Sequence, residues 1–244
     1  MKNFIIISIL SLAITQIAFA QWGNSIALSS NITTESIDIS NFDRISVTDD
    51  FVAFIKFGDE EKIQIEANEN LHDYIIVEKE GDELKIRTKS YSTNNKNGVD
   101  EKLVAHITAK KLTAISGDND AEIRVLDKIE ANSFNINLDD DATLKGEFKV
   151  RTLDVNMDDD AELEIEGSAD KMELDADSDS MIDGYRLIVN DLDIHLDGDS
   201  ESRLTVNGTL NVTTKGDSEF TYKGSATVAR KRVTGDSDVQ HIRD

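Results

Sequence analysis

The sequence predicts an all-β fold: a single-stranded, right-handed parallel β-helix, or solenoid, with coils of about 19 residues and an irregular, β-rich N-terminal portion. Three observations predict it. A nine-residue motif occurs seven times, apolar residues alternate in front of it, and the chain contains no proline. A unit this short cannot bury an apolar face alone, whereas stacked units can. A propeller blade needs about 40 residues, and the pattern of leucine-rich repeats is absent.

The motif defines the repeat. Its seven copies align without gaps at residues 115–123, 136–144, 155–163, 174–182, 194–202, 212–220 and 231–239. The sixth position is always Asp, at 120, 141, 160, 179, 199, 217 and 236, and the seventh is always Ala or Ser. Successive copies of this Asp lie 18 to 21 residues apart. This regular spacing indicates one coil per repeat.

Each repeat predicts a strand, a tight turn and a second strand. Before Asp160, for example, Leu153, Val155 and Met157 alternate with polar residues, which places them on one face of a strand. The acidic cluster that follows is typical of a turn, because Asp and Asn bond their own backbone and tolerate left-handed geometry. Leu163 then returns to the core. The small seventh residue fits a crowded corner, and proline would interrupt the strand ladders.

The front of the chain is β-rich but does not keep the period. Residues 90–100 are polar and predict an exposed loop, whereas residues 45–50 resemble a degenerate earlier coil. We predict one solenoid domain over residues 41–244, with an irregular part at 41–110 and regular repeats at 112–244. Residues 21–40 would form a linker or cap. A separate small sandwich at the front is the alternative.

Residues 1–20 match a secretory signal peptide. Lys2 precedes a short apolar run, which ends in Ala18-Phe19-Ala20. The alternative, a membrane anchor, needs about 20 apolar residues, and the polar Thr15 and Gln16 shorten the run. We therefore expect an exported protein in the periplasm, on the outer-membrane surface or secreted, which does not span the membrane once the signal is removed.

The charge balance excludes several partners. The chain has 26 Lys and Arg against 49 Asp and Glu, a net charge of −23. A nucleic-acid ligand is excluded because its phosphates require Lys and Arg. The absence of cysteine removes disulfides and thiolate metal sites. The four histidines, His72, His106, His195 and His241, lack the spacing of a zinc site. Cations and basic partners remain.

The order of several segments is similar to that of a known family. The segments are 41–47, 54–59, 63–71, 81–86 and 109–120. Their succession resembles the auto-transporter adhesin head domain, or GIN domain, of exported Bacteroidetes proteins over about residues 40–240. The resemblance implies a β-helix-like fold and an adhesin role, and it supplies no binding or catalytic residues. Where that family favours Ser-Gly-Ser or Ser-Gly-Ala turns, this chain has Asp-rich ones.

The candidate site consists of two columns of Asp residues that stacked coils would form along one edge of the solenoid. Five coils carry Asp at both the fourth and the sixth motif position: Asp118 and Asp120, Asp139 and Asp141, Asp158 and Asp160, Asp177 and Asp179, and Asp197 and Asp199. Asp140 and Asp159 add carboxylates at the fifth position. Like charges ~4.8 Å apart repel by about 0.9 kcal/mol even in water. Either backbone N–H groups offset this repulsion, or Ca²⁺ binds between coils. The spacing matches neither an EF-hand nor the nonapeptide calcium repeat.

A catalytic site has little support. Glycosidases use two carboxyl groups in different surroundings, whereas these pairs are equivalent from coil to coil. Phe134 and Phe220 fall at inward positions, so we expect core residues and not a sugar platform. We expect a non-enzymatic adhesin or structural module of the cell envelope, without a cofactor, that binds a surface protein or glycan. One alternative is a Ca²⁺-dependent binding module; a weaker one is a polysaccharide-degrading β-helix enzyme. Unpaired solenoid ends would allow a homo-oligomer.

Overall fold

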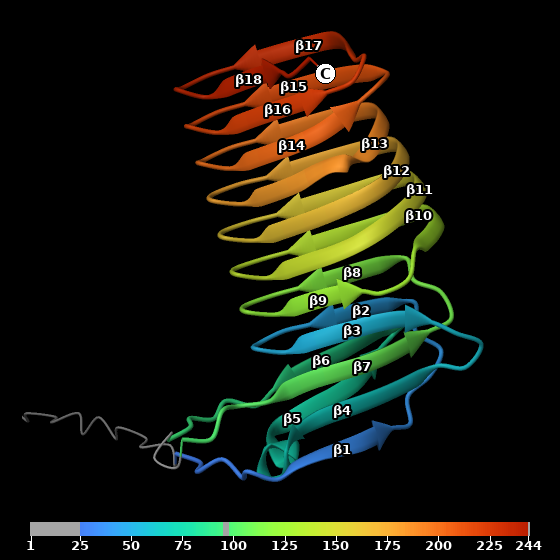
Figure 1. The fold of residues 1–244 in the computed structure, drawn as a ribbon, viewed down its shortest axis with the longest axis vertical. Coiled ribbons are helices and arrows are strands. Elements are labelled where there is room, and N and C mark those ends of the chain that lie inside the picture. Colours follow the sequence, from blue (N-terminus) through green and yellow to red (C-terminus); the bar gives the residue numbers. More distant parts are fainter. Residues whose placement is uncertain (1–24, 95–97, 244) are drawn as a thin grey trace, which may run out of the picture.

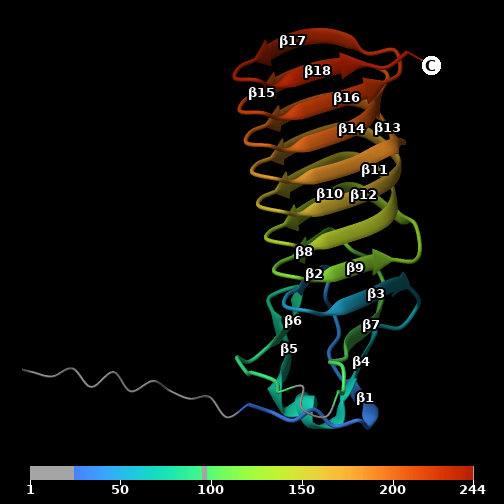
Figure 2. The same cartoon turned by 60° about the vertical axis from the view of Figure 1, so that its left-hand side comes forward.

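The computed structural model describes residues 25–94 and 98–243, so the predicted signal peptide lies outside the described residues. In this part of the chain, eighteen strands join one continuous sheet that winds into a solenoid (Figure 1). The two views show a tall stack, with the N-terminal strands at the base and β18 at the opposite end (Figure 2). The predicted fold class is confirmed.

The regular coils follow the predicted repeat. Their strands are β8 (Ala114–Gly117), β9 (Glu122–Val125), β10 (Ile129–Leu138), β11 (Thr143–Met157), β12 (Glu162–Ala176), β13 (Met181–Leu196), β14 (Glu201–Val206), β15 (Thr209–Thr214), β16 (Glu219–Lys223), β17 (Thr227–Val233) and β18 (Asp238–His241). In each coil one strand lies before the acidic turn and one after it. The long strands β11 to β13 each run from the second strand of one coil into the first strand of the next.

Equivalent residues of successive coils lie directly above one another. Val155 pairs in parallel register with Leu174, and Leu174 with Ile194. All three are buried between the two faces of the coil. Phe134 and Phe220 are also fully buried, as predicted. Stacking like on like thus builds one core along the whole solenoid, which a single coil could not do.

The irregular part contains one further coil. Its strands are β1 (Ile32–Ile37), β2 (Arg44–Val47), β3 (Val52–Phe57), β4 (Lys62–Asn68), β5 (Ile75–Glu80), β6 (Glu83–Thr88) and β7 (Leu103–Ala109), with the 3₁₀ helix η1 (Glu69–Tyr74) between β4 and β5. Ile45 of β2 pairs with Ile115 of β8, and Ala53 of β3 with Ile123 of β9. The predicted degenerate coil is therefore confirmed, and the front strands continue the solenoid.

The base below this coil departs from the repeat. Strands β6 and β7 still run parallel to β2 and β3, but β5, β4 and β1 are antiparallel to their neighbours. Leu71 of η1 and Leu28 are buried there and close the end of the core. The change from parallel to antiparallel pairing breaks the 19-residue period, because hairpins need shorter connections than solenoid coils.

Candidate functional site

The acidic turns lie on one side of the stack, which we call the turn edge (Figure 1). It comprises the four-residue turns at 48–51, 118–121, 139–142, 158–161, 177–180, 197–200, 215–218 and 234–237. These are motif positions four to seven, and each turn joins the two strands of one coil. Because the coils stack in register, each position forms a column along the edge.

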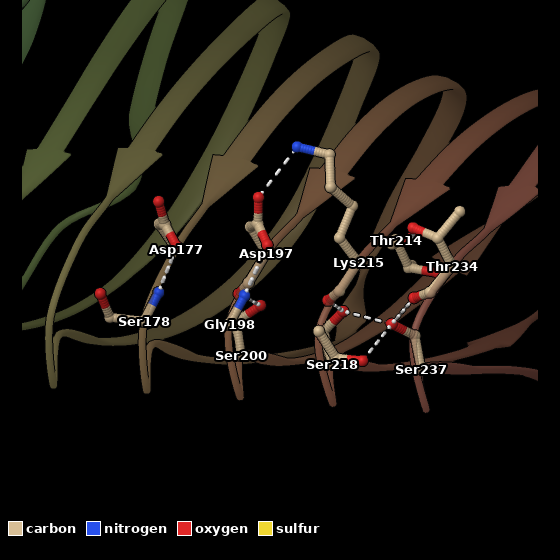
Figure 3. A network of polar contacts seen from close by, with 11 residues as sticks. Asp177, Ser178, Asp197, Gly198, Ser200, Thr214, Lys215, Ser218, Thr234 and Ser237 are labelled. Atoms are coloured by element: carbon tan, nitrogen blue, oxygen red, sulfur yellow. Dashed lines mark hydrogen bonds and ion pairs between the residues drawn. The ribbon is translucent and has the colours of Figure 1, made fainter.

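The fourth-position carboxylates serve the turns. Asp118, Asp139, Asp158, Asp177 and Asp197 each accept a hydrogen bond from the backbone N–H of the next residue, at 2.7–3.0 Å. That next residue has a positive φ in every case, from 52° at Asp140 to 66° at Gly198. Asp, Asn and Gly tolerate this conformation, which explains the composition of the turns. Figure 3 shows two of these contacts, at Asp177 and Asp197.

In the regular coils the seventh position is small because it points into the corner of the coil, whereas the turn at 48–51 carries the buried Phe51 there. Ala121, Ala142 and Ala161 are buried there in the first coils. In later coils the buried hydroxyls of Ser200 and Ser218 donate to the carbonyl groups of Asp197 and Lys215 in their own turns, at 2.9 and 2.7 Å (Figure 3). Ser200 and Ser218 therefore stabilise the conformation of their turns.

The sixth-position carboxylates have no such role. Asp120, Asp141, Asp160, Asp179 and Asp199 are exposed. Within the described ranges, none of them accepts a hydrogen bond or forms an ion pair. The sixth position thus leaves a row of uncompensated negative charge along the crest of the turn edge.

Among the described residues, three carboxyl groups lie close enough together to share one metal ion. One oxygen each of Asp139, Asp140 and Asp159 lies within 4.8 Å of the other two. Burial, and then the negative charges of Asp118, Asp139 and Asp159, raise the pKa of Asp140 above its ordinary value. Three coils after Asp140 the situation is reversed: Lys215 lies 2.9 Å from Asp197 and lowers the pKa of that carboxyl. The carboxyl groups of the turn edge are therefore compensated to different degrees from coil to coil.

This cluster differs from the predicted set of ten metal ligands. Only Asp139 belongs to both, and its partners Asp140 and Asp159 come from the fifth position. Of the other nine predicted residues, Asp141, Asp158 and Asp160 lie in the same two turns, and the remaining six lie in turns above and below. The signal in the sequence was the run of three Asp residues, which among the seven motif copies occurs only at 139–141 and 158–160.

A shallow groove of about 530 Å³ runs beside the turn edge. It crosses β2, β8, β10, β11, β12 and β13 on the outer face of the sheet. Its polar side chains come from two motif positions: Ser46, Ser116, Asn137, Asn156, Asp175 and His195 from the second, and Thr48, Asp118, Asp139, Asp158, Asp177 and Asp197 from the fourth. Asn156 donates to Asn137 on the adjacent coil at 3.2 Å. The sequence shows the second position as outward, with Ser, Asn, Asp or Thr in other coils and His195 in one, but indicates only a plain surface there and not a groove.

The strands after the turns carry a different surface. Lys145 lies 3.0 Å from Glu164 on the next coil, and Arg186 lies 3.2 and 3.0 Å from Glu164 and Glu166. These contacts link three successive coils through alternating charges. Exposed pairs of this kind contribute little stability each, but they balance the charge of that face. The uncompensated acid is thus concentrated at the turn edge.

A parallel β-solenoid with an acidic edge and a polar groove places the chain among rigid, repetitive scaffold proteins. The chain belongs to the family described as "Putative auto-transporter adhesin, head GIN domain", which matches residues 41–226. The resemblance found in the sequence is confirmed. This is an adhesin-type family of exported or surface proteins. None of the curated proteins compared with the chain matches it.

Solved structures share the fold. A protein described as a putative adhesin from Bacteroides fragilis is 17% identical, with a TM-score of 0.74 over 90% of this chain and 100% of that chain. One with the same description from Parabacteroides merdae is 18% identical, with a TM-score of 0.70 over 89% and 99%. A putative lipid binding protein from Parabacteroides distasonis is 18% identical, with a TM-score of 0.71 over the same shares. At these identities the likeness concerns the fold.

A helix long and apolar enough to cross a membrane is not found in the described part of the chain.

Proposed function

We propose that the protein is an exported, non-enzymatic adhesin-type module that binds a surface protein or glycan along the groove beside its turn edge. The observation that carries this proposal is the groove itself, which crosses six strands and presents hydrogen-bonding side chains from each. Neighbouring strands lie about 4.8 Å apart, so the groove repeats the same polar groups at that interval. Such a surface suits an extended partner with a repeating backbone.

The charge of the edge favours a partner with cationic groups. The fourth- and sixth-position carboxylates lie on either side of the turns, and the exposed row of the sixth position lacks a cationic neighbour within the described residues. A surface with one sign of charge attracts and orients the opposite sign, and this attraction weakens as salt is added. Binding should therefore be fastest and tightest at low ionic strength.

Equivalence of the coils supports a binding role over catalysis. A glycosidase needs one carboxyl group that holds a proton and another that stays ionised, in different surroundings. The fourth-position Asp residues make the same hydrogen bond in five coils. Phe134 and Phe220 lie in the core and offer no stacking surface to a sugar ring.

The binding proposal predicts a charge-dependent loss of affinity. We would replace Asp139, Asp158 and Asp177 with Asn, which can still accept the turn hydrogen bond. With a deca-lysine peptide as the probe, binding measured by calorimetry at low salt should weaken about tenfold, because three exposed ion pairs are lost.

The matched control removes the same number of negative charges from a different part of the surface. Glu162→Gln, Asp183→Asn and Glu219→Gln alter exposed acids on strands that follow the turns. This control should bind like the wild type. Equal losses in both triple variants would mean that net charge alone attracts the peptide, and would contradict a role for the groove.

A Ca²⁺-dependent module is the second candidate, and the cluster of Asp139, Asp140 and Asp159 favours it. Calcium takes six to eight oxygen ligands at 2.3–2.6 Å, so oxygens within 4.8 Å of one another can share one ion. These three carboxylates would hold the ion and water would complete its shell. The ion would also relieve the repulsion that raises the pKa of Asp140.

Melting with EDTA, Mg²⁺ or Ca²⁺ at matched ionic strength tests this candidate. Calcium at about 100 times its dissociation constant should raise the melting temperature by about 5–10 °C, because it binds only the folded state. Asp140→Asn with Asp159→Asn should remove this rise, whereas Asp179→Asn with Asp199→Asn should keep it. The same shift with Mg²⁺, or in every variant, would indicate screening alone.

The pH dependence without metal gives a further readout in the same experiment. Folding raises the pKa of Asp140, so the folded state holds its proton more tightly than the unfolded state does. The stability linked to this proton is present below the ordinary pKa of 3.8 and is lost as the pH rises through the folded-state pKa. At pH 7 in EDTA, the variant Asp140→Asn should melt above the wild type.

A further inference from the structure

The C-terminal end of the solenoid differs from its base. In the described residues, β17 pairs only with β15, and β18 only with β16. All seven residues of β17 are exposed, and Val228 and Val233 keep 41% and 38% of their surface. Edge strands of this kind pair with other chains unless something blocks them. At the base, by contrast, Leu71 and Leu28 close the core.

Lys231 occupies a position that is apolar in every other regular coil. It pairs in register with Val212 of β15, which is buried, and the corresponding residues of the coils below are Ile194 and Leu174. Its ammonium group donates to the backbone carbonyl of Val239 in β18, at 3.2 Å. The lysine side chain therefore runs from one face of the last coil to the other and covers the end of the core.

Two arginines flank this lysine. Arg230 and Arg232 are exposed on β17, and within the described residues neither forms an ion pair. Three consecutive cations are the one compact basic cluster in a chain of net charge −23. Lysine on an edge strand and a charged residue at an inward position are both known means of preventing edge-to-edge pairing. Two copies meeting at this end would bring like charges together.

We propose that β17 and β18 form an end cap, in which Lys231 closes the core and the three cations exclude a second copy of the chain. The cap lies just beyond residues 41–226, the part that the family matches. The solenoid is then closed at both ends and is a monomer in solution. This inference is independent of the proposed binding function, and it predicts the opposite of the end-to-end homo-oligomer that unpaired solenoid ends would allow.

Sedimentation velocity over a wide concentration range tests the cap. The wild type should sediment as a monomer at every concentration. Arg230→Ser, Lys231→Val and Arg232→Ser together should convert it to a species whose mass rises with concentration, because the apolar end and the strand edges are then free to pair. The control triple variant, Lys149→Ser, Arg151→Ser and Lys171→Val, removes the same charge from strands that are paired on both edges and should stay monomeric.

A second variant distinguishes loss of the charge from unfolding of the cap. Lys231→Met keeps the length of the side chain and its cover over the core but removes the charge and the hydrogen bond to Val239. With circular dichroism unchanged, it should still self-associate, more weakly than the triple variant. A wild type that already associates through this end, or cap variants that remain monomers at the highest concentration, would overturn the proposal.

Discussion

Replacing Gly167 with Ala is expected to destabilise the solenoid by about 4 kcal/mol or more, a loss that only a few mechanisms, such as severe backbone strain, produce. Gly167 lies in β12 with a φ of 111°, a conformation that side chains rarely adopt. A Cβ atom there would lie 1.9 Å from the carbonyl oxygen of Phe148 on the coil below. Because that oxygen is backbone, a rotamer change cannot relieve the clash, and β11 and β12 must separate.

The measurement is thermal and denaturant unfolding. For a chain of this size, 1 kcal/mol corresponds to about 2–4 °C, so the melting temperature should fall by about 10 °C or more. Gly81→Ala is the matched control, since Gly81 also has a positive φ, 61°, but its Cβ would meet no atom within 4 Å. It should cost only about 1–2 kcal/mol, the strain of left-handed backbone. If Gly167→Ala and Gly81→Ala lost the same stability, the cause would be the positive φ and not the close approach of the two coils.

The regular coils could be predicted because the sequence repeats what the structure repeats. Asp at the sixth position and the alternating residues before it set the register of each coil, and the structure pairs Val155 with Leu174 accordingly. The base could not be predicted in this way. Its strands β4 to β7 interrupt the chain between β3 and β8, whereas in space the coil of β2 and β3 pairs directly with the coil of β8 and β9.

For the candidate site, the sequence predicts the columns of Asp residues along the turn edge, but it does not predict which carboxyl groups lie next to one another. That Asp118 and its equivalents serve the turns follows from general turn chemistry. The proximity of Asp140 to Asp159 depends on the left-handed conformation of both residues, which the motif does not show. The groove arises because second- and fourth-position side chains of adjacent strands share one outer face, so it appears only once the coils are stacked.

Phe134→Ala should have the second largest effect, about 3–5 kcal/mol. Phe134 is fully buried in β10 and packs edge-on against Phe148, which lies on the strand after the turn of the same coil, with ring centroids 5.4 Å apart. Such a pair adds about 0.5–1.5 kcal/mol to the burial of the rings. Phe134→Leu, which retains most of the apolar volume, should cost about 1.5 kcal/mol or less.

The consequence for unfolding follows from the architecture. Each coil contacts only its neighbours, so a cavity inside the coil that holds Phe134 and Phe148 weakens the link between the base and the C-terminal coils. Hydrogen exchange should then show the two parts opening separately in Phe134→Ala and together in the wild type. A loss below about 1 kcal/mol would place Phe134 outside the core. It would then be free to serve as the aromatic platform that a polysaccharide-degrading enzyme requires, and the binding proposal would lose one of its supports.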